Sequence, residues 1–407
     1  MEAMRDGPRA ALGSGHALKG AGLLAKVSAG ALTLALASAA MAQQAPAAAD
    51  EDIVVTGYRA SLANAIAEKK SSDMIVESIS AEDIGKLPDT SIAESISRLP
   101  GLAAQREGGR ARNLSIRGLA PDFSTTLLNG REQVTTNDNR GVDFDQFPSE
   151  MISQVNVYKT PSANLIGAGL SGTVDLRTAR PLDKDKRTIA LGARAELLDA
   201  SRLNPDSSKW GYRFSGTYID QFADNRIGIA LNATHMSSPS QTERFEAWGY
   251  PTVNGASVIG GTKSHAISGD LERTSLTGTL EWRPSEAISS SVDIFWSRFK
   301  DHQTRRGIEL PLAWGNGVPL TNAVVEDGAI ISGTFSNVKA VVRNDIKNRD
   351  ADLFSAGWNV SAGNDVLRAT FDVSYAQVDR KDLDIESYSG TGRGYLEGST
   401  SRGATDT

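Results

Sequence analysis

The chain has 407 residues, of which 40% are hydrophobic, and a formal net charge of -6. It contains no cysteine, which excludes a disulfide framework and any thiolate metal site. The mildly acidic balance gives no electrostatic footprint for nucleic acid, so we expect no nucleic-acid partner. The four histidines are scattered and lack metal-ligand spacing. We therefore expect no metal, no cofactor, no catalytic residues and no enzymatic activity.

Residues 1–42 have the three-part layout of a secretory signal. Four basic residues precede an uncharged, Ala- and Leu-rich run over 27–39, and Ala40-Met41-Ala42 is a small-x-small cleavage pattern. The alternative, a membrane anchor, needs about 20 apolar residues, and this run is shorter. The layout predicts export by a cleaved signal peptide, with a mature chain that begins near Gln43.

Residues 43–70 are predicted to be a tether. An Ala-, Pro- and Gln-rich stretch leads into residues 53–56, all of which are β-branched. A flexible, strand-prone segment of this kind suits pairing with the sheet edge of a partner protein. The alternative is an ordinary edge strand of the domain that follows.

Residues 71–181 are predicted to form a compact α+β domain. Ser91 and Glu94 have the spacing of a capping box, and the apolar positions after Ser91 indicate a short helix that Pro100-Gly101 ends. Asn129-Gly130 is a strong signal for a tight hairpin turn. Short strands are expected at 114–117, 125–128, 131–134, 152–158 and 173–177.

Gly167, Gly169 and Gly172 spell G-x-G-x-x-G, a pattern that is typical of dinucleotide-binding folds. That fingerprint needs a helix directly after the glycines. Residues 173–177 alternate and are β-branched in part, which predicts a strand instead. The glycines are therefore expected to serve a tight turn or close backbone packing.

Residues 184–407 are predicted to begin an antiparallel transmembrane β-barrel. Apolar and polar side chains alternate along seven runs, each about as long as the 9–11 residues that a tilted strand needs to cross a bilayer. In one run, for example, Leu280 and Trp282 alternate with Thr279 and Glu281. The runs lie at 188–198, 210–219, 227–234, 275–282, 288–297, 354–360 and 367–375.

A soluble β-sandwich also alternates, but two observations favour the barrel. Charged residues such as Arg213, Asp293 and Asp372 occur well inside the runs, where a wet lumen suits them better than a dry core. Short and long connections also alternate along the chain, as periplasmic turns and extracellular loops do. The short turns are expected at 220–225, 283–286 and 363–365, and the long loops at 237–270 and 300–350.

Several segments resemble the signatures of TonB-dependent outer-membrane receptors. Residues 52–57 resemble the TonB box, and 114–118, 127–131 and 148–161 resemble signatures of the plug domain, in the family's order and spacing. The sequences of these motifs are similar to those of the subfamily common in Caulobacter- and Xanthomonas-like bacteria. The residues that carry the resemblance are Asp52, Ile53, Val54, Val55, Thr56 and Gly57 in the box, and Arg117, Gly118, Asn129, Gly130, Arg131, Gly167, Gly169 and Gly172 in the plug.

The resemblance implies active import across the outer membrane of a Gram-negative cell. The box would pair with TonB, energised through ExbB and ExbD, and a pull on the tether would rearrange the plug within a barrel embedded in outer-membrane lipid. The substrate class implied is an oligosaccharide, with a ferric siderophore as the alternative and a passive porin or adhesin as a more distant one. Ligand would meet polar residues of the plug's apical loops beside one aromatic, although these can equally be ordinary solvated loop residues. The candidates are Arg106, Arg110, Arg112, Asp122, Phe123, Asn137, Asp138, Asn139 and Arg140.

Seven strands do not close a barrel of this kind. Large plugged barrels use about 22 strands, and bacterial barrels have an even number. We therefore expect the chain to be the N-terminal portion of a longer receptor, with only about a third of the wall on that expectation. Unpaired strand edges are not tolerated in lipid, so the chain by itself is not expected to insert as a working transporter.

Overall fold

The computed structural model describes residues 65–80, 91–107, 109–184, 186–315 and 318–390, all within the compact unit Gly57–Thr407. The expected signal peptide and the segment at 52–57 lie outside these residues. Within the described part of the chain, no helix is both long enough and apolar enough to cross a membrane.

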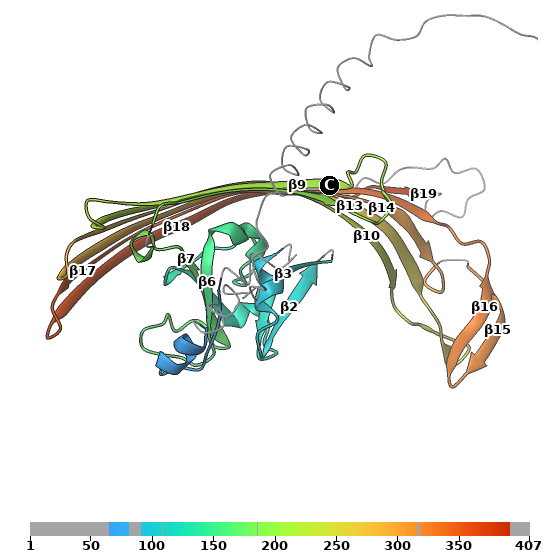
Figure 1. Cartoon of the computed structure of the whole chain (residues 1–407). Helices are drawn as coiled ribbons and strands as arrows, with labels where there is room; N and C mark the ends of the chain where they lie inside the picture. The colour runs from blue at the N-terminus through green and yellow to red at the C-terminus, as the bar shows by residue number, and fades with distance from the viewer. Residues whose placement is uncertain (1–64, 81–90, 108, 185, 316–317, 391–407) are drawn as a thin grey trace, which may run out of the picture. The chain divides into compact units, whose positions relative to one another are not determined.

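The compact domain is built on a five-stranded sheet with the order β1-β6-β7-β4-β5 (Figure 1). β4 and β7 pair in parallel, and the other neighbours are antiparallel. A separate hairpin, β2–β3, and the short helix α4 pack beside it. The bounds are β1 Val76–Ser80, α4 Ile92–Ile96, β2 Leu102–Glu107, β3 Arg110–Ile116, β4 Ser124–Leu128, β5 Arg131–Glu132, β6 Ile152–Tyr158 and β7 Gly172–Thr178. Single 3-10 turns, η1 Pro121–Phe123, η2 Phe144–Gln146, η3 Ser149–Met151 and η4 Pro181–Asp183, connect these strands and lead to the next sheet.

The local signals in this domain have the expected outcome, with two corrections, of which the first is the end of the helix: α4 ends at Ile96, four residues before Pro100. Asn129 and Gly130 both have positive φ, of 53° and 81°, which a tight β4–β5 turn requires. Ser91 caps α4, but its side chain accepts from the Ala93 amide at 3.2 Å. The second correction is that the carboxylate of Glu94 pairs with Arg106 at 2.8 Å, so the expected capping box is replaced by an N-cap hydrogen bond that Ser91 alone accepts.

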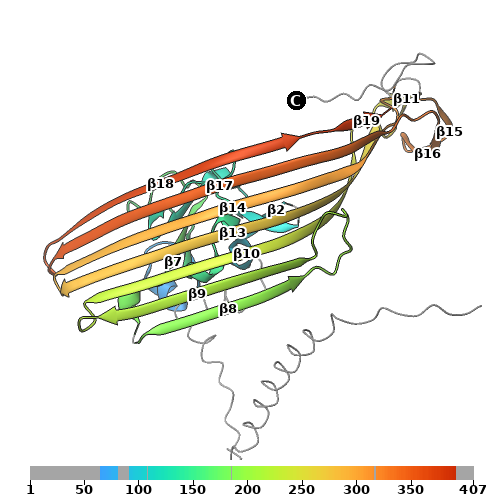
Figure 2. The ribbon, with the colours of Figure 1, turned by 90° about the horizontal axis from the view of Figure 1, so that it is seen from above.

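A second, larger sheet contains all seven expected strands, in the order β18-β17-β14-β13-β10-β9-β8 (Figure 2). Every neighbouring pair is antiparallel, and the short β19 pairs with the far end of β17. We call this sheet the wall. Its strands are β8 Thr188–Leu197, β9 Trp210–Phe222, β10 Ile227–Ala247, β13 Gly261–Ser285, β14 Ile288–Pro311, β17 Val341–Gly363, β18 Arg368–Ile385 and β19 Tyr388–Gly390. The fold is thus an α+β domain followed by an antiparallel sheet whose described strands do not close into a barrel.

Four of these strands, β10, β13, β14 and β17, are more than twice as long as the alternation predicts, and the two long loops expected at 237–270 and 300–350 are wrong in large part. β10 and β13 remain paired as far as Ala247 and Thr262, and β14 and β17 remain paired as far as Glu309 and Val341. The reason is chemical. On the outward face of β14, Ile294 and Trp296 give way to Arg298 and Lys300, so hydrophobic alternation stops although backbone pairing continues.

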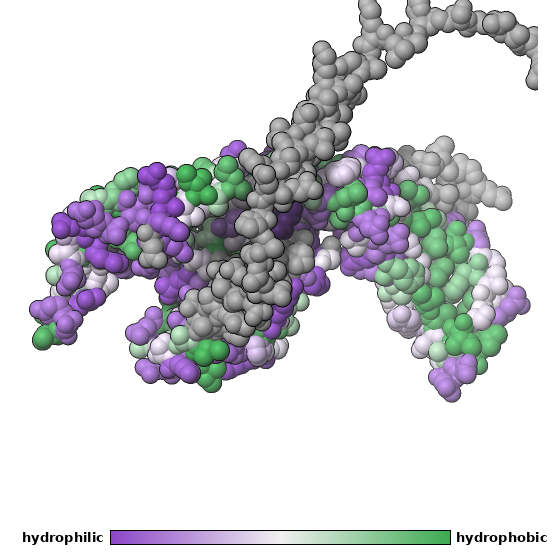
Figure 3. All heavy atoms as spheres, in the orientation of Figure 1, coloured by the Kyte–Doolittle hydropathy of each residue, from purple (hydrophilic) through white to green (hydrophobic). Residues whose placement is uncertain are grey.

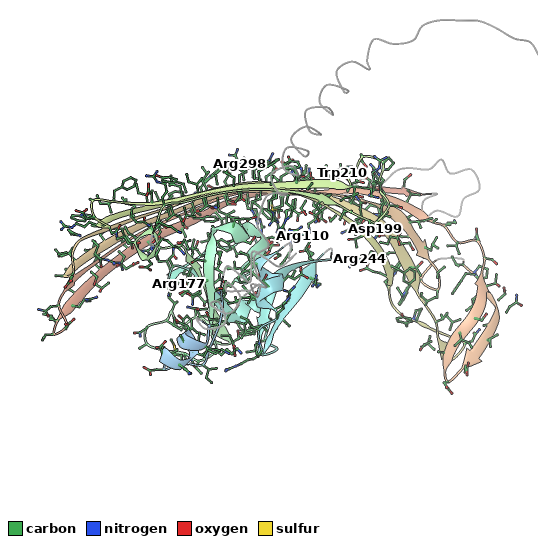
Figure 4. All side chains as sticks on the ribbon, viewed as in Figure 1. Arg110, Arg177, Asp199, Trp210, Arg244 and Arg298 are labelled. Carbon is green, nitrogen blue, oxygen red and sulfur yellow. The ribbon has the colours of Figure 1, made fainter. Side chains whose placement is uncertain are left out.

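The two faces of the wall differ in chemistry. On β14, Asp293, Phe295, Ser297 and Phe299 are buried, whereas Ile294 between them is 47% exposed. Figure 4 shows Arg110 of the compact domain on the concave side of the sheet, with Arg298 and Trp210 at its other face. The concave face is therefore the inner one, polar and covered by the compact domain, and the opposite face carries the exposed apolar residues.

One hydrophobic core joins the two parts. Its residues include Ile92, Val155 and Leu176 of the compact domain together with Phe295 and Phe299 of the wall. The rings of Phe147 and Phe295 lie 5.4 Å apart across the junction. Burial of large aromatic side chains from both parts fixes their contact more firmly than polar contacts alone would.

A small four-stranded sheet, order β11-β12-β16-β15, lies at the end of the wall opposite the short turns (Figure 2). Its strands are β11 Thr252–Val253, β12 Ala256–Ser257, β15 Leu320–Glu326 and β16 Ala329–Phe335. Apolar side chains are visible in this region in Figure 3, where Val324, Val325 and Ile331 are each more than half exposed. We call this end of the wall the rim.

Candidate functional site

Two arginines of β3 form the centre of the junction between the compact domain and the wall. Arg110 and Arg112 lie close together on β3, where the ladder has a bulge at Arg112, and both guanidinium groups lie within 4.0 Å of the Asp145 carboxylate. Arg110 Nε donates to Asp145 Oδ2 at 2.9 Å, and its Nη1 donates to Ser238 Oγ of β10 at 2.8 Å. Arg112 Nη2 donates to Asp301 of β14, and its Nε lies 3.5 Å from Asp143 Oδ2. Both guanidinium groups therefore link the domain to the wall.

The two acids of this cluster are shifted in opposite directions. Burial raises the pKa of the Asp143 carboxyl to about 6, against the opposing charge of Arg112. Its Oδ2 atom has no hydrogen-bond partner among the described residues. Burial acts on Asp145 too, but the charges of Arg110 and Arg112 outweigh it and lower the pKa of that carboxyl below its ordinary value. Asp145 thus remains charged and paired with Arg110, whereas Asp143 can exchange a proton near neutrality.

A polar cavity of about 220 Å³ lies beside Arg112, between the compact domain and β14 and β17. Its lining contains three carboxylates, three cationic side chains and four amides, so the formal charges cancel. The lining residues are Glu107, Asp138, Asp301, Arg112, Lys347, Arg349, Asn113, Asn137, Asn139 and Gln303. Such a site offers many hydrogen-bond donors and acceptors but no net attraction for a charged ligand.

A second ion-pair group lies nearer the short turns of the wall. Arg131, directly after the Asn129-Gly130 turn, donates to Asp293 of β14 at 2.7 Å and to Asp372 of β18 at 2.9 Å. A Cβ on Gly357 of β17 would overlap this guanidinium, so the glycine makes room for it. One plug-motif arginine therefore contacts two wall strands and passes over a third that lies between them in the sheet.

Two further groups complete the junction. Glu150 pairs with Arg213 of β9 at 3.1 Å, and the fully buried Arg273 of β13 donates to the carbonyls of Asp145 and Phe147. At the other side of the wall, Arg380 of β18 pairs with Asp138 and donates to Thr136 O at 2.8 Å. Polar contacts thus run from β9 to β18 across the inner face.

The structure places the predicted ligand residues in three different environments. Arg112, Asn137, Asp138 and Asn139 line the cavity. Arg110 forms an ion pair with Asp145, and the carboxylate of Asp122 accepts a hydrogen bond from the Gly141 amide at 3.2 Å. Arg106, Phe123 and Arg140 are exposed and do not line it.

Arg106, Arg110 and Arg112, which were expected in an apical loop, lie instead in the paired strands of the β2–β3 hairpin. Six lining residues were not predicted. Glu107 and Asn113 lie within this hairpin, and Asp301, Gln303, Lys347 and Arg349 lie in the strand extensions that the sequence suggested were loops. Residues 301 and 303, and residues 347 and 349, are two positions apart, which is the spacing of side chains on one face of a strand. Because these residues are polar, hydrophobic alternation does not reveal the strand.

The glycine cluster has a packing role at its last position. Gly172 has φ +151° and begins β7, and a Cβ there would lie 2.7 Å from Tyr158 O of the neighbouring strand. Gly167, in contrast, has open space around it. A strand follows the cluster, as the sequence predicted, which is incompatible with the helix that dinucleotide binding needs. In the described residues no group of three or more metal-ligating side chains is present.

Residues 68–174 match the family model of the TonB-dependent Receptor Plug Domain. The compact domain is therefore a plug domain, and the chain combines it with an antiparallel sheet that presents an apolar outer face and a polar inner one.

Similar proteins include the ferric enterobactin receptor PirA of Pseudomonas aeruginosa, 26% identical over 77% of this chain and 42% of that protein. The vitamin B12 transporter BtuB of Vibrio vulnificus is 24% identical over 84% of this chain and 54% of that protein. The chain thus spans about half the length of these curated relatives. Among solved structures, the siderophore receptor PirA from Acinetobacter baumannii aligns with 80% of this chain and 60% of its own, at 12% identity and a TM-score of 0.38.

Proposed function

We propose that this chain takes part in energised import across the Gram-negative outer membrane, as a TonB-dependent transporter. The plug-domain match and the two-faced wall support this role. In the proposal, residues 52–57 pair with TonB, which is energised through ExbB and ExbD, and the plug domain gates a path through the wall. A cleaved signal peptide over residues 1–42 would deliver the chain to the envelope.

We further propose that the substrate is an oligosaccharide, bound in the polar cavity. The observation that carries this is the lining, in which charges cancel and four of ten side chains are amides. Hydroxyl groups both donate and accept, so a sugar can satisfy amides, carboxylates and guanidinium groups at once. An anionic metal chelate would be better matched by a lining with net positive charge.

A ferric siderophore is the second candidate. It is favoured by the similarity to the ferric enterobactin receptor, which extends over 77% of this chain. The two substrates separate in growth experiments with a strain that lacks the gene. Loss of an oligosaccharide transporter should slow growth on that sugar with iron in excess, whereas loss of a siderophore receptor should matter only when iron is limiting.

Energy coupling is tested by removing Asp52–Gly57. The expected result is loss of uptake with retained binding of ligand at the cell surface, because the cavity lies in residues that the deletion leaves intact. Removing the six residues 44–49 is the matched control, since it shortens the tether equally. Uptake that survives the loss of Asp52–Gly57 would instead support a passive porin.

A further inference from the structure

The charges that line the polar cavity sum to zero, but they are not evenly distributed. At one end Arg112 pairs with Glu107 at 3.1 Å and also with Asp301, so a single lining cation serves two lining carboxylates. The rest of the charged lining consists of one carboxylate and two cations, and it therefore carries a net positive charge.

Two of these three remaining residues have ion-pair partners that lie outside the lining. Asp138 pairs with Arg380, and Arg349 pairs with Asp382 at 3.0 Å. The third, Lys347, forms neither an ion pair nor a side-chain hydrogen bond with any residue that the structure describes. The excess positive charge of the cavity is thus located on one ammonium group.

The position of Lys347 in β17 explains why it belongs to the cavity. Its cross-strand neighbour on β14 is Gln303, and both side chains line the cavity. On the other side, Asp384 of β18 lies opposite Lys347 in the ladder, but the two form no ion pair and Asp384 does not line the cavity. The Lys347 side chain therefore contributes to the cavity rather than to a pair with Asp384.

Two amides of the lining also leave hydrogen-bond donors free. Asn113 Oδ1 accepts from Asn137 Nδ2 at 2.8 Å, and Asn139 Oδ1 accepts from the Gly141 amide at 3.1 Å. The Nδ2 groups of Asn113 and Asn139 donate to no residue in the described part of the chain. An ammonium group has three donors and each amide nitrogen has two, so the cavity offers free donors to a ligand rich in acceptors. An anionic group is the strongest acceptor that such a ligand can present.

Building on the proposed oligosaccharide substrate, we propose that the cavity selects sugars that carry a single anionic group, a uronate carboxylate or a sulfate ester, and that Lys347 binds this group. The free amide donors of Asn113 and Asn139 bind oxygens of the same sugar. An ammonium group is a compact point charge, so it accepts either kind of anion. Because the lining as a whole is neutral, the preference is a local contact that extends to one charge only.

Matched disaccharides test this preference. Cellobiose, maltose and gentiobiose would each be compared with the form in which the terminal CH₂OH group is oxidised to a carboxylate, and with the sulfate ester of the same group. Equilibrium binding would be measured on outer membranes that contain the receptor, without an energy source. For the disaccharide that binds, at least one anionic form should bind roughly ten-fold more tightly than the neutral form, the effect of one charge-assisted hydrogen bond. The advantage should fall as the salt concentration rises, because Lys347 is exposed to solvent.

Lys347→Gln should abolish this advantage, because the neutral and anionic forms would then bind alike, and Lys347→Arg should retain it. Lys381→Gln is the matched control. Lys381 lies opposite Asp350, in the same row of β17 as the outward Asp352, so this change removes the same charge from the other face of the wall. The control should keep the full advantage of the anionic form.

Equal affinities of the neutral and anionic forms for the unmodified receptor, or an advantage that Lys347→Gln leaves intact, would overturn the proposal while the oligosaccharide substrate stands. An advantage that appears only in an Asp384→Asn variant would also overturn it, since Asp384 would then hold Lys347 in the unmodified receptor. If none of the disaccharides binds in any form, the oligosaccharide proposal itself fails, and the role of Lys347 fails with it.

Discussion

Arg112 of the plug domain and Asp301 of the wall form an ion pair at the edge of the polar cavity. The same two side chains therefore line the proposed ligand site and join the two parts of the molecule. A ligand that hydrogen-bonds to either one competes with the contact that holds the plug domain against β14. In the proposed transporter, this pair would link ligand binding to release of the plug domain.

Asp301→Asn should weaken the junction. Arg112 would keep Asp143 and Glu107 as partners but would lose its wall carboxylate, so we expect a loss of about 1–3 kcal/mol in the free energy of unfolding. Denaturant unfolding in detergent, with protease sensitivity of the plug domain as a second readout, measures this. Asp352→Asn is the control, because that carboxylate pairs with Arg298 on the exposed outer face at 2.9 Å and should matter by less than about 1 kcal/mol. Equal effects of the two changes would contradict the proposed importance of the junction.

Stability should fall as the pH rises towards neutrality, through Asp143. The pKa of this carboxyl is about 6 in the folded plug domain, above its ordinary value. Between that ordinary value and about 6, the folded state binds a proton that the unfolded chain releases, so acidification stabilises the fold at this site. Asp143→Asn should therefore flatten the stability profile between pH 4 and 7, by an amount on the order of 2–3 kcal/mol.

The neighbouring Asp145 changes the stability with pH in the opposite direction. Its lowered pKa contributes stability that is present above the ordinary carboxyl range and is lost only as the pH falls through the lowered value. The two contributions therefore occupy different pH windows and can be separated. An unchanged slope between pH 4 and 7 in the Asp143→Asn variant would show that this carboxyl is not protonated in the folded state.

Gly357→Ala should displace Arg131 without changing any charge. The added methyl group would overlap the guanidinium that pairs with Asp293 and Asp372, and overpacking of this kind costs about 1–3 kcal/mol. We expect a looser plug domain, measured as entry of a large antibiotic that the intact outer membrane excludes. Gly278→Ala is the control, because its methyl group would meet only Leu231, at an ordinary 3.5 Å on the outer face. The same leak in both variants would point to a general weakening of the sheet.

The sequence predicted the fold well where one physical signal dominates. Alternation located all seven wall strands, because one face meets an apolar environment and the other meets polar groups. Asn129-Gly130 located a turn, because few residue pairs accept positive φ at both positions. Strand length was underestimated where Arg298 and Lys300 replace apolar residues, because backbone pairing does not depend on hydrophobicity.

The sequence predicted the residues that the plug domain contributes to the candidate site, but not those that the wall contributes. Arg112 and Asn137 to Asn139 lie in the plug domain, whose motifs indicated where its apical residues fall. Their partners Asp301 and Arg349 lie far away in sequence, in polar strand extensions without a motif. The partners of Arg131 on β14 and β18 are likewise a property of tertiary packing, which spacing along one chain does not reveal.

The ion pairs that join the plug domain to β9, β14 and β18 also bear on how the molecule is assembled. Asp293 is buried because Arg131 and Arg180 meet it there, and Arg273 is fully buried against plug-domain carbonyls. Without the plug domain, Asp293 would keep Thr279 of the wall as a hydrogen-bond donor but would lose both arginines, at a cost of several kcal/mol for a charge that stayed out of water. The plug domain thus supplies counter-charges for the wall, so we expect the two parts to assemble together rather than one after the other.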